Sequence, residues 1–286
     1  MIDLHMHTTA SDGKLTPEQL VARAAEAGVR VLSVTDHDTV GGCVRARAAC
    51  EAAEIEFVAG IEITSVVGGA DVHVLGYFVD TRSTPFETFL ARQRQHRVDR
   101  VREMVATLAR FGMPLDVDEI LKPGVDDASR AIGRPYIARA LVAKGFVASV
   151  SEAFEKWLSR GTPAFVPRIG ASPEEVFAEI HAANGLASLA HPLLSKVDDR
   201  IPEYASAGLD ALEVYHSKHD EHTTARYLAL ARSLGLLVTG GSDFHADEEH
   251  GGGGPGAVTL PREDYERLCQ RRAASRATAS GSSISS

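Results

Sequence analysis

The sequence predicts an α/β protein in which parallel strands alternate with helices. The clearest helix signals lie at 16–28 and 172–185, where a capping Thr or Ser is followed by Pro and then by Gln or Glu, and a Gly ends the segment. Short apolar runs surround these helices, at 1–7, 29–38 and 186–192. This alternation is typical of parallel strands joined by crossover helices.

The remaining strand signals fall into two groups, separated by a long helical stretch. We expect further strands at 57–64, 71–78, 209–216, 236–245 and 256–260. Between them, the helical pattern that starts near residue 84 continues with Gly and Pro breaks to Leu158. The predicted organisation is therefore an α/β body at 1–81 and 161–270, a helical insertion that caps the site at 82–160, and a flexible Ser-rich and Ala-rich tail at 271–286.

Composition narrows the class of protein and its partners. The 286 residues are 44% hydrophobic and 24% charged, as in ordinary soluble globular proteins. The net charge of −9 argues against binding of duplex DNA or other long nucleic acid, but leaves a short phosphorylated substrate open. The three cysteines have no metal-type spacing, and no apolar run approaches the roughly 20 residues that span a bilayer. We expect a cytoplasmic protein with no membrane contact.

Metal-ligand side chains recur where the predicted strands end. Because carboxyl ends of parallel barrel strands meet at one rim, we expect these side chains to converge there. Residues two apart in a strand face the same side, so His5 and His7 can reach one ion, and Asp12 in the following loop can return a carboxylate toward it. Taken singly, Glu62 or His73 would more simply be a structural residue. The recurring positions are His5, His7, Asp36 to Asp38, Glu62, His73, His191, Asp243 and His245.

Six short motifs, taken in order, resemble those of the PHP (polymerase and histidinol phosphatase) superfamily. They are DLHMHTTASDG, VTDHDTV, GIEIT, HVLGY, LAHP and GSDFH. The resemblance implies a distorted seven-stranded (β/α) barrel with a trinuclear metal centre that hydrolyses phosphoesters. It also implies three ligand sets: His5, His7, Glu62 and Asp243; Asp12, His37 and His245; and Glu62, His73 and His191, with Glu62 bridging.

Within this superfamily, ASDG after the first histidine pair and a helical insertion after HVLGYF are similar to the branch that acts on nucleoside 3',5'-bisphosphates. The resemblance implies removal of the 3'-phosphate from a small nucleotide such as pAp, to give the 5'-mononucleotide. The alternatives are a 5'-to-3' exonuclease on short RNA, a histidinol-phosphate-type phosphatase and a metal-binding module without catalysis.

Histidine and carboxylate ligands without thiolates suit Mn²⁺, Fe²⁺, Zn²⁺ or Mg²⁺, and the resemblance favours manganese, with up to three ions. Such ions acidify water and offset phosphoryl charge. We place Asp12, His37 and His245 at the reacting centre. The proton donor for the leaving oxygen stays open between His37, His245 and a metal-bound water.

A bisphosphate substrate also needs a grip on the phosphate that is not cleaved, and arginine provides a bidentate one. An arginine-rich helix is more commonly a solvated face paired with glutamates, so these assignments compete with a structural alternative. Arg130 and Arg134 rank first because they lie in a stretch broken by Gly and Pro. The full set of candidate substrate contacts is Arg97, Arg100, Ser129, Arg130, Arg134, Lys218 and His222.

Overall fold

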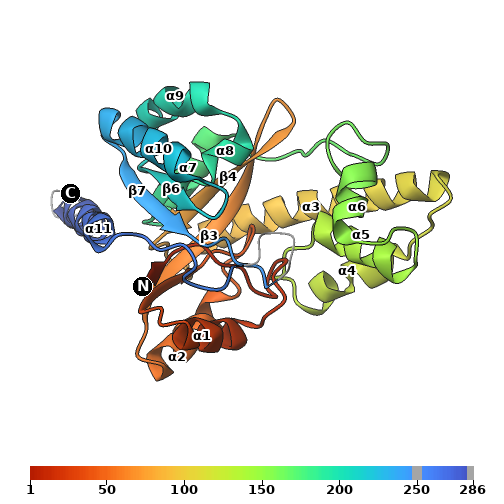
Figure 1. Cartoon of the computed structure of the whole chain (residues 1–286), viewed down its shortest axis with the longest axis horizontal. Helices are drawn as coiled ribbons and strands as arrows, with labels where there is room; N and C mark the ends of the chain where they lie inside the picture. The colour runs from red at the N-terminus through yellow and green to blue at the C-terminus, as the bar shows by residue number, and fades with distance from the viewer. Residues whose placement is uncertain (247–252, 282–286) are drawn as a thin grey trace.

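Seven strands form one sheet in the order in which they occur along the chain. They are β1 (Ile2–Asp3), β2 (Val31–Val34), β3 (Glu56–Val67), β4 (Ala70–Tyr77), β5 (Leu186–Leu189), β6 (Ala211–His216) and β7 (Leu237–Gly241). The sheet curls until its edges meet, where the amide of Leu4 donates to the carbonyl of Gly240 (3.2 Å) and the amide of Asp243 to that of His5 (2.8 Å). This computed structural model, which describes residues 1–246 and 253–281, confirms a nearly closed seven-stranded α/β barrel (Figure 1).

One strand runs against the predicted direction. β4 pairs antiparallel with both β3 and β5, whereas the other neighbouring pairs are parallel. Only Gly68 and Gly69 separate β3 from β4, and both have positive φ (55° and 74°), as in a tight hairpin turn. A parallel pair would need a crossover of about a dozen residues or more, so the prediction of parallel strands throughout was wrong here.

The reversal of β4 also corrects where two ligand candidates lie. Glu62 and His73 are inside β3 and β4, not at the ends of strands as predicted. Because β4 runs antiparallel, its first half reaches the same rim as the carboxyl ends of the parallel strands. His73 pairs in register with Thr64, two residues beyond Glu62, so the hairpin carries both side chains to one place.

Helices cover the outside of the barrel. Both predicted capping boxes are present, between Thr16 and Gln19 and between Ser172 and Glu175. The segment 256–260, predicted as a strand, is not one: the Ile2 amide donates to the hydroxyl of Thr259 (3.0 Å), which replaces a ladder bond. The surrounding helices are α1 (Pro17–Glu26), α2 (Cys43–Ala52), α7 (Pro173–Ala182), α8 (Pro192–Ser195), a 3₁₀ turn η2 (Asp198–Arg200), α9 (Ile201–Ser206), α10 (Glu221–Ser233) and α11 (Arg262–Gly281).

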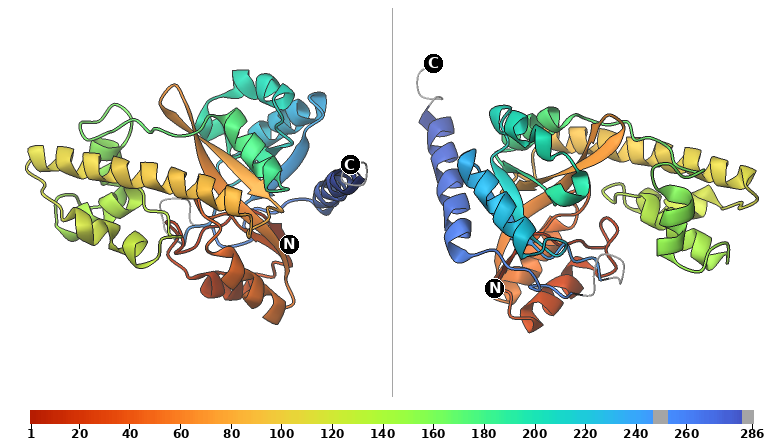
Figure 2. Two further views of the ribbon diagram at one scale, coloured as in Figure 1. Left: turned by 180° about the vertical axis from the view of Figure 1, so that it is seen from behind. Right: turned by 45° about the horizontal axis from the view of Figure 1, so that its top comes forward.

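The stretch in which the sequence predicted a helical insertion, 82–160, extends to one side of the barrel (Figures 1 and 2). Every residue of it is described, and it contains helices and no strand: α3 (Thr84–Arg110), α4 (Val117–Asp126), α5 (Arg134–Ala143), α6 (Val150–Ala153) and a π-helical turn η1 (Phe154–Leu158). These helices pack around their own apolar cluster, which includes Met104, Leu108, Ile137, Leu141 and Leu158. We call this stretch the insertion.

The chain after residue 270, where the composition predicted a flexible tail, begins as a continuation of α11. α11 continues to Gly281, because Tyr265 and Leu268 anchor its first turns in the barrel core and Arg and Ala favour continuation of a helix. The last part of the predicted tail, 282–286, lies outside the described residues. In the described part of the chain, no helix combines the length and the apolar character needed to cross a membrane.

Candidate metal centre

All nine predicted metal ligands converge at one end of the barrel. His5 and His7 follow β1, His37 follows β2, His191 follows β5, and Asp243 and His245 follow β7. Eight of the nine side chains are buried and His73 is half-buried, which is unusual for so many ionisable groups. Eight of them form three groups, in each of which the ligand atoms lie within 4.8 Å of one another: His7, Asp12, His37 and His245; His5, His7 and Asp243; and His37, Glu62 and His73.

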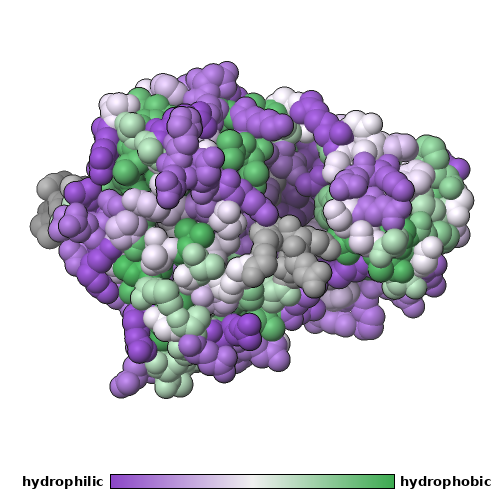
Figure 3. Space-filling view, in the orientation of Figure 1, coloured by the Kyte–Doolittle hydropathy of each residue, from purple (hydrophilic) through white to green (hydrophobic). Residues whose placement is uncertain are grey.

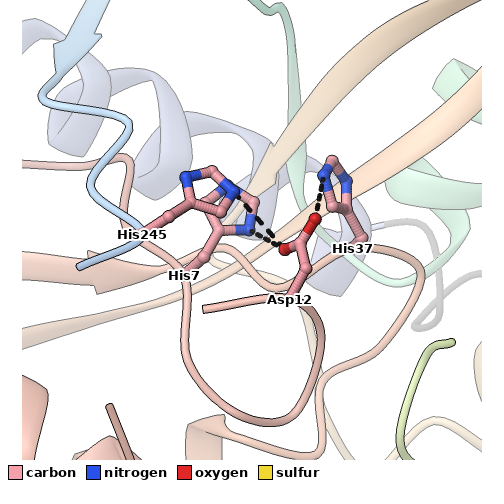
Figure 4. Close-up of side chains that lie close together, drawn as sticks. All are labelled: His7, Asp12, His37 and His245. Carbon is pink, nitrogen blue, oxygen red and sulfur yellow. Dashed lines mark ion pairs between the residues drawn. The ribbon is translucent and has the colours of Figure 1, made fainter. Parts of the chain in front are cut away.

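The Asp12 carboxylate lies at the centre of the first group. Figure 4 shows the rings of His7, His37 and His245 gathered around it. One carboxylate oxygen is 3.7 Å from Nδ1 of His7 and 3.4 Å from Nε2 of His245, and the other is 3.6 Å from Nε2 of His37. A single cation between these atoms would find one carboxylate and three imidazoles.

Glu62 connects the other two groups. One carboxylate oxygen of Glu62 lies 2.8 Å from Nδ1 of His73 and 3.0 Å from Nε2 of His191. The second oxygen lies 3.1 Å from Nδ1 of His37, 3.2 Å from Nε2 of His7 and 3.5 Å from Nε2 of His5. Although burial alone would raise its pKa, the surrounding histidines hold the pKa of Glu62 well below its usual range. A carboxylate in contact with five histidines fits a bridging ligand.

The chemistry of these atoms fits divalent cations. Three buried ring nitrogens, Nε2 of His5, Nε2 of His7 and Nδ1 of His37, receive no hydrogen bond from the described residues. Each lies 3.1–3.5 Å from a carboxylate oxygen of Glu62 or Asp243. Buried imidazoles and carboxylates that face one another without hydrogen bonds are the arrangement a bound cation satisfies, and their N and O donors suit first-row divalent ions.

Further polar residues orient the ligands, and of these sequence reasoning did not select Glu213. Glu213 is buried in β6, 2.9 Å from Nδ1 of His5, and accepts a hydrogen bond from the amide of His191 (2.7 Å). His216, also in β6, places Nε2 3.3 Å from the second oxygen of Asp243. The signal for Glu213 was present, since it is a carboxylate in the middle of the predicted strand run LDALEVYH.

A cavity of about 170 Å³ adjoins the ligand cluster. Asp12, His37 and His73 line one side of it, and four arginines line the other: Arg97, Arg100, Arg134 and Arg168. We call it the arginine cavity. On the face drawn in Figure 3, the surface between the barrel and the insertion is hollowed and hydrophilic.

Two carboxylates, the buried Asp38 and the half-buried Asp71, hold the four guanidinium groups. Asp38 pairs with Arg97 and with Arg168 (3.3 Å). Asp71 lies 3.3 Å from Arg100, 3.2 Å from Arg134 and 3.6 Å from Arg168. Burial, together with the neighbouring guanidinium groups, lowers the pKa of both Arg100 and Arg168 to about 10. The four guanidinium groups exceed these two partner carboxylates by two positive charges, and Asp12 lines the cavity on the side of the ligand cluster.

The structure brings only some of the candidate substrate contacts to this cavity. Arg97, Arg100 and Arg134 line it, and Arg168, which lies outside the insertion, was not predicted. Arg130 lines a separate groove between α3 and α4, and Ser129 donates a hydrogen bond to Asp127 (2.6 Å). Lys218 and His222 are exposed near the start of α10 and do not line the described cavities of the site.

Comparison with known proteins agrees with this geometry. The family model described as PHP domain matches residues 3–129. The chain is 33% identical to a 3',5'-nucleoside bisphosphate phosphatase of Chromobacterium violaceum, over 87% of this chain and 89% of the relative. It is 35% identical to the 5'-3' exoribonuclease Rnm of Escherichia coli, over 85% and 84% of the two chains.

Two solved structures share the whole architecture. One is a protein assigned as a metal-dependent phosphoesterase from Bifidobacterium adolescentis, with a TM-score of 0.85, 32% identity and coverage of 94% of this chain and 95% of that one. The other is an amidohydrolase from Chromobacterium violaceum with bound sulfate and no metal, with a TM-score of 0.83, 32% identity and coverage of 95% and 96%. The chain belongs to the PHP-domain family of metal-dependent phosphoesterases.

Proposed function

We propose that the protein removes the 3'-phosphate from nucleoside 3',5'-bisphosphates such as pAp and releases the 5'-mononucleotide. The observation that carries this proposal is the arginine cavity beside the ligand cluster. A phosphomonoester needs one site for the phosphate that is cleaved. A bisphosphate needs a second anion site a short distance away, and the four arginines offer it.

Glu62 and the eight ligand candidates around it are the residues that would hold up to three divalent ions, and we propose Mn²⁺ as the metal. When bound, such ions polarise the phosphoryl group and acidify a water. The arginines would bind the phosphate that stays on the product, and thereby align the other phosphate with the ligand cluster. Asp12, His37 and His245 remain the residues proposed at the reacting centre, and Asp12 and His37 also line the arginine cavity.

A 5'-3' exoribonuclease acting on short RNA is the second candidate. The relatives with this activity match the chain as well as the bisphosphate phosphatase does, with 34% to 35% identity. A histidinol-phosphate-type phosphatase has no need of a second phosphate site, and the complete ligand set argues against a module without catalysis.

The three cysteines form no disulfide, which supports our proposal of a cytoplasmic location.

The test is phosphate release by manganese-loaded protein, with identification of the products, on pAp, 3'-AMP, AMP, histidinol phosphate and a 5'-phosphorylated RNA pentamer. We expect conversion of pAp to AMP with much weaker action on AMP itself. Trimming of the pentamer with weak action on pAp would move the function to RNA decay. The variants His7→Ala and Asp243→Asn serve as inactive controls, with folding checked by circular dichroism.

A further inference from the structure

The loop that carries Asp12 is held by the insertion through its backbone. This loop, residues 8–13, connects His7 to the stretch before α1. Three consecutive carbonyl groups in it accept hydrogen bonds from the insertion: Ala10 from the amide of Ala131 (2.9 Å), Ser11 from the hydroxyl of Tyr136 (2.6 Å), and Asp12 from the guanidinium of Arg139 (3.3 Å).

The barrel holds the same loop from its other side. Asp36 accepts hydrogen bonds from the amide and the hydroxyl of Thr8 and from the hydroxyl of Ser11, each at 2.7 Å. Gly13 closes the loop so tightly that a Cβ there would lie 2.5 Å from the carbonyl oxygen of His7. None of these barrel contacts uses the three consecutive carbonyl groups, so the insertion makes a separate contribution to the position of Asp12.

Tyr136 and Arg139 are arranged to act as a unit. They are three residues apart on α5, so their side chains share one face of the helix. The guanidinium carbon of Arg139 lies 4.6 Å from the centre of the Tyr136 ring, within the range of a cation–π contact. Arg134, in the first turn of the same helix, lines the arginine cavity. One short helix therefore contacts both the anion site and the loop of a metal ligand.

We propose that Tyr136 and Arg139 are positioning residues of the metal centre, which fix the 8–13 loop so that the Asp12 carboxylate is in place before a cation binds. The proposal rests on the proposed metal centre. The physical reason is conformational entropy. A ligand that is already ordered in the free protein loses little entropy when the ion binds, whereas a loose loop must become ordered, and this lowers the affinity for the ion. The insertion would then complete the metal site as well as cap it.

The test compares two Tyr→Phe variants of the full-length apoprotein. Each is titrated with Mn²⁺, and binding is measured by calorimetry and by electron paramagnetic resonance. Tyr136→Phe removes the hydroxyl that reaches Ser11. Tyr227→Phe is the matched control, because its hydroxyl donates to Asp198 (2.8 Å), which is neither a ligand candidate nor part of the 8–13 loop. Asp12→Asn identifies which bound ion depends on Asp12.

For Tyr136→Phe we expect about threefold to tenfold weaker binding of the ion that Asp12→Asn affects, the equivalent of one hydrogen bond, with the other ions unchanged. Adding Arg139→Ala to this variant should weaken the binding of the same ion further. Both Tyr→Phe variants should lower the melting temperature of the apoprotein, because each loses a hydrogen bond, but only Tyr136→Phe should alter metal binding. Affinities within twofold of the control for every ion would overturn the inference, whereas a wild-type protein that binds no Mn²⁺ would overturn the proposed function itself.

Discussion

Replacement of Arg134 by alanine tests the anion site without breaking the fold. The Arg134 side chain is about a quarter exposed (27%), and its guanidinium lies 3.2 Å from Asp71. Asp71 keeps Arg100 and Arg168 as partners when Arg134 is lost, so this half-buried carboxylate is not left alone. A hydrogen bond to a charged group contributes about 1.5–3 kcal/mol. Because Arg134 must exchange Asp71 for the phosphate, we expect the lower value, an increase in KM of about tenfold.

The assay is steady-state phosphate release with two substrates, pAp and 3'-AMP. Both carry the 3'-phosphate that is cleaved, but only pAp carries a second phosphate for the arginines. The KM for pAp should rise about tenfold in Arg134→Ala, while the KM for 3'-AMP changes little and kcat is retained for both. Arg45→Ala is the matched control, since Arg45 also pairs with a carboxylate, Glu18 (2.6 Å), but on an exposed surface away from the site.

An equal change in KM for both substrates would refute the role of Arg134 in holding the second phosphate. A fall in kcat alone would also refute it, because it would show that Arg134 acts on the phosphate that is cleaved. In either case the arginine cavity would no longer distinguish a bisphosphatase from a simple phosphatase.

Three further predictions concern the buried polar groups. Glu213→Gln should weaken Mn²⁺ binding about tenfold to hundredfold in a calorimetric titration, because Glu213 orients His5; unchanged affinity would contradict this. Asp38→Asn should cost about 3 kcal/mol in urea unfolding, since it leaves Arg97 without its carboxylate partner and Arg168 with Asp71 alone, while Asn tolerates the φ of 51° at this position. Burial raises the pKa of the Cys43 thiol to about 12, so Cys43 should resist Ellman's reagent at pH 8 until the protein is unfolded.

The ligand cluster could be predicted because its signal is local. His5 and His7 alternate within three residues, and Asp243 and His245 repeat the pattern, so each pair reaches one rim whatever the rest of the chain does. The direction of β4 could not be predicted from strand patterns alone, although Gly68 and Gly69 marked a turn too short for a crossover. The motif still placed His73 correctly beside Glu62, because the antiparallel hairpin delivers it to the same rim.

The arginine cavity could be predicted only in part because its contacts are long-range. Arg168 meets Asp38 across 130 positions of the sequence, and Arg134 meets Asp71 across 63. Helical spacing identified Arg97 and Arg100 as neighbours on α3, but no local pattern distinguishes Asp71 from a solvated residue at the start of a strand. Arg130 ranked high because Gly and Pro lie near it in the sequence. In the structure it lines the groove between α3 and α4 and does not line the arginine cavity.

The charge of the arginine cavity relates the two candidate functions to each other. The four arginines exceed their partner carboxylates, Asp38 and Asp71, by two positive charges, which matches a terminal phosphate with about −1.5 to −2 at pH 7. An internal phosphodiester carries a single negative charge and would leave part of the buried positive charge uncompensated. Both pAp and the 5' end of a phosphorylated RNA present a terminal phosphate, so both can satisfy the same four arginines.

The two activities would then differ in what lies at the ligand cluster, a 3'-phosphomonoester in one and the first phosphodiester in the other. Since that choice depends on the space beyond the cluster, comparison of pAp with a 5'-phosphorylated dinucleotide is the measurement that separates them.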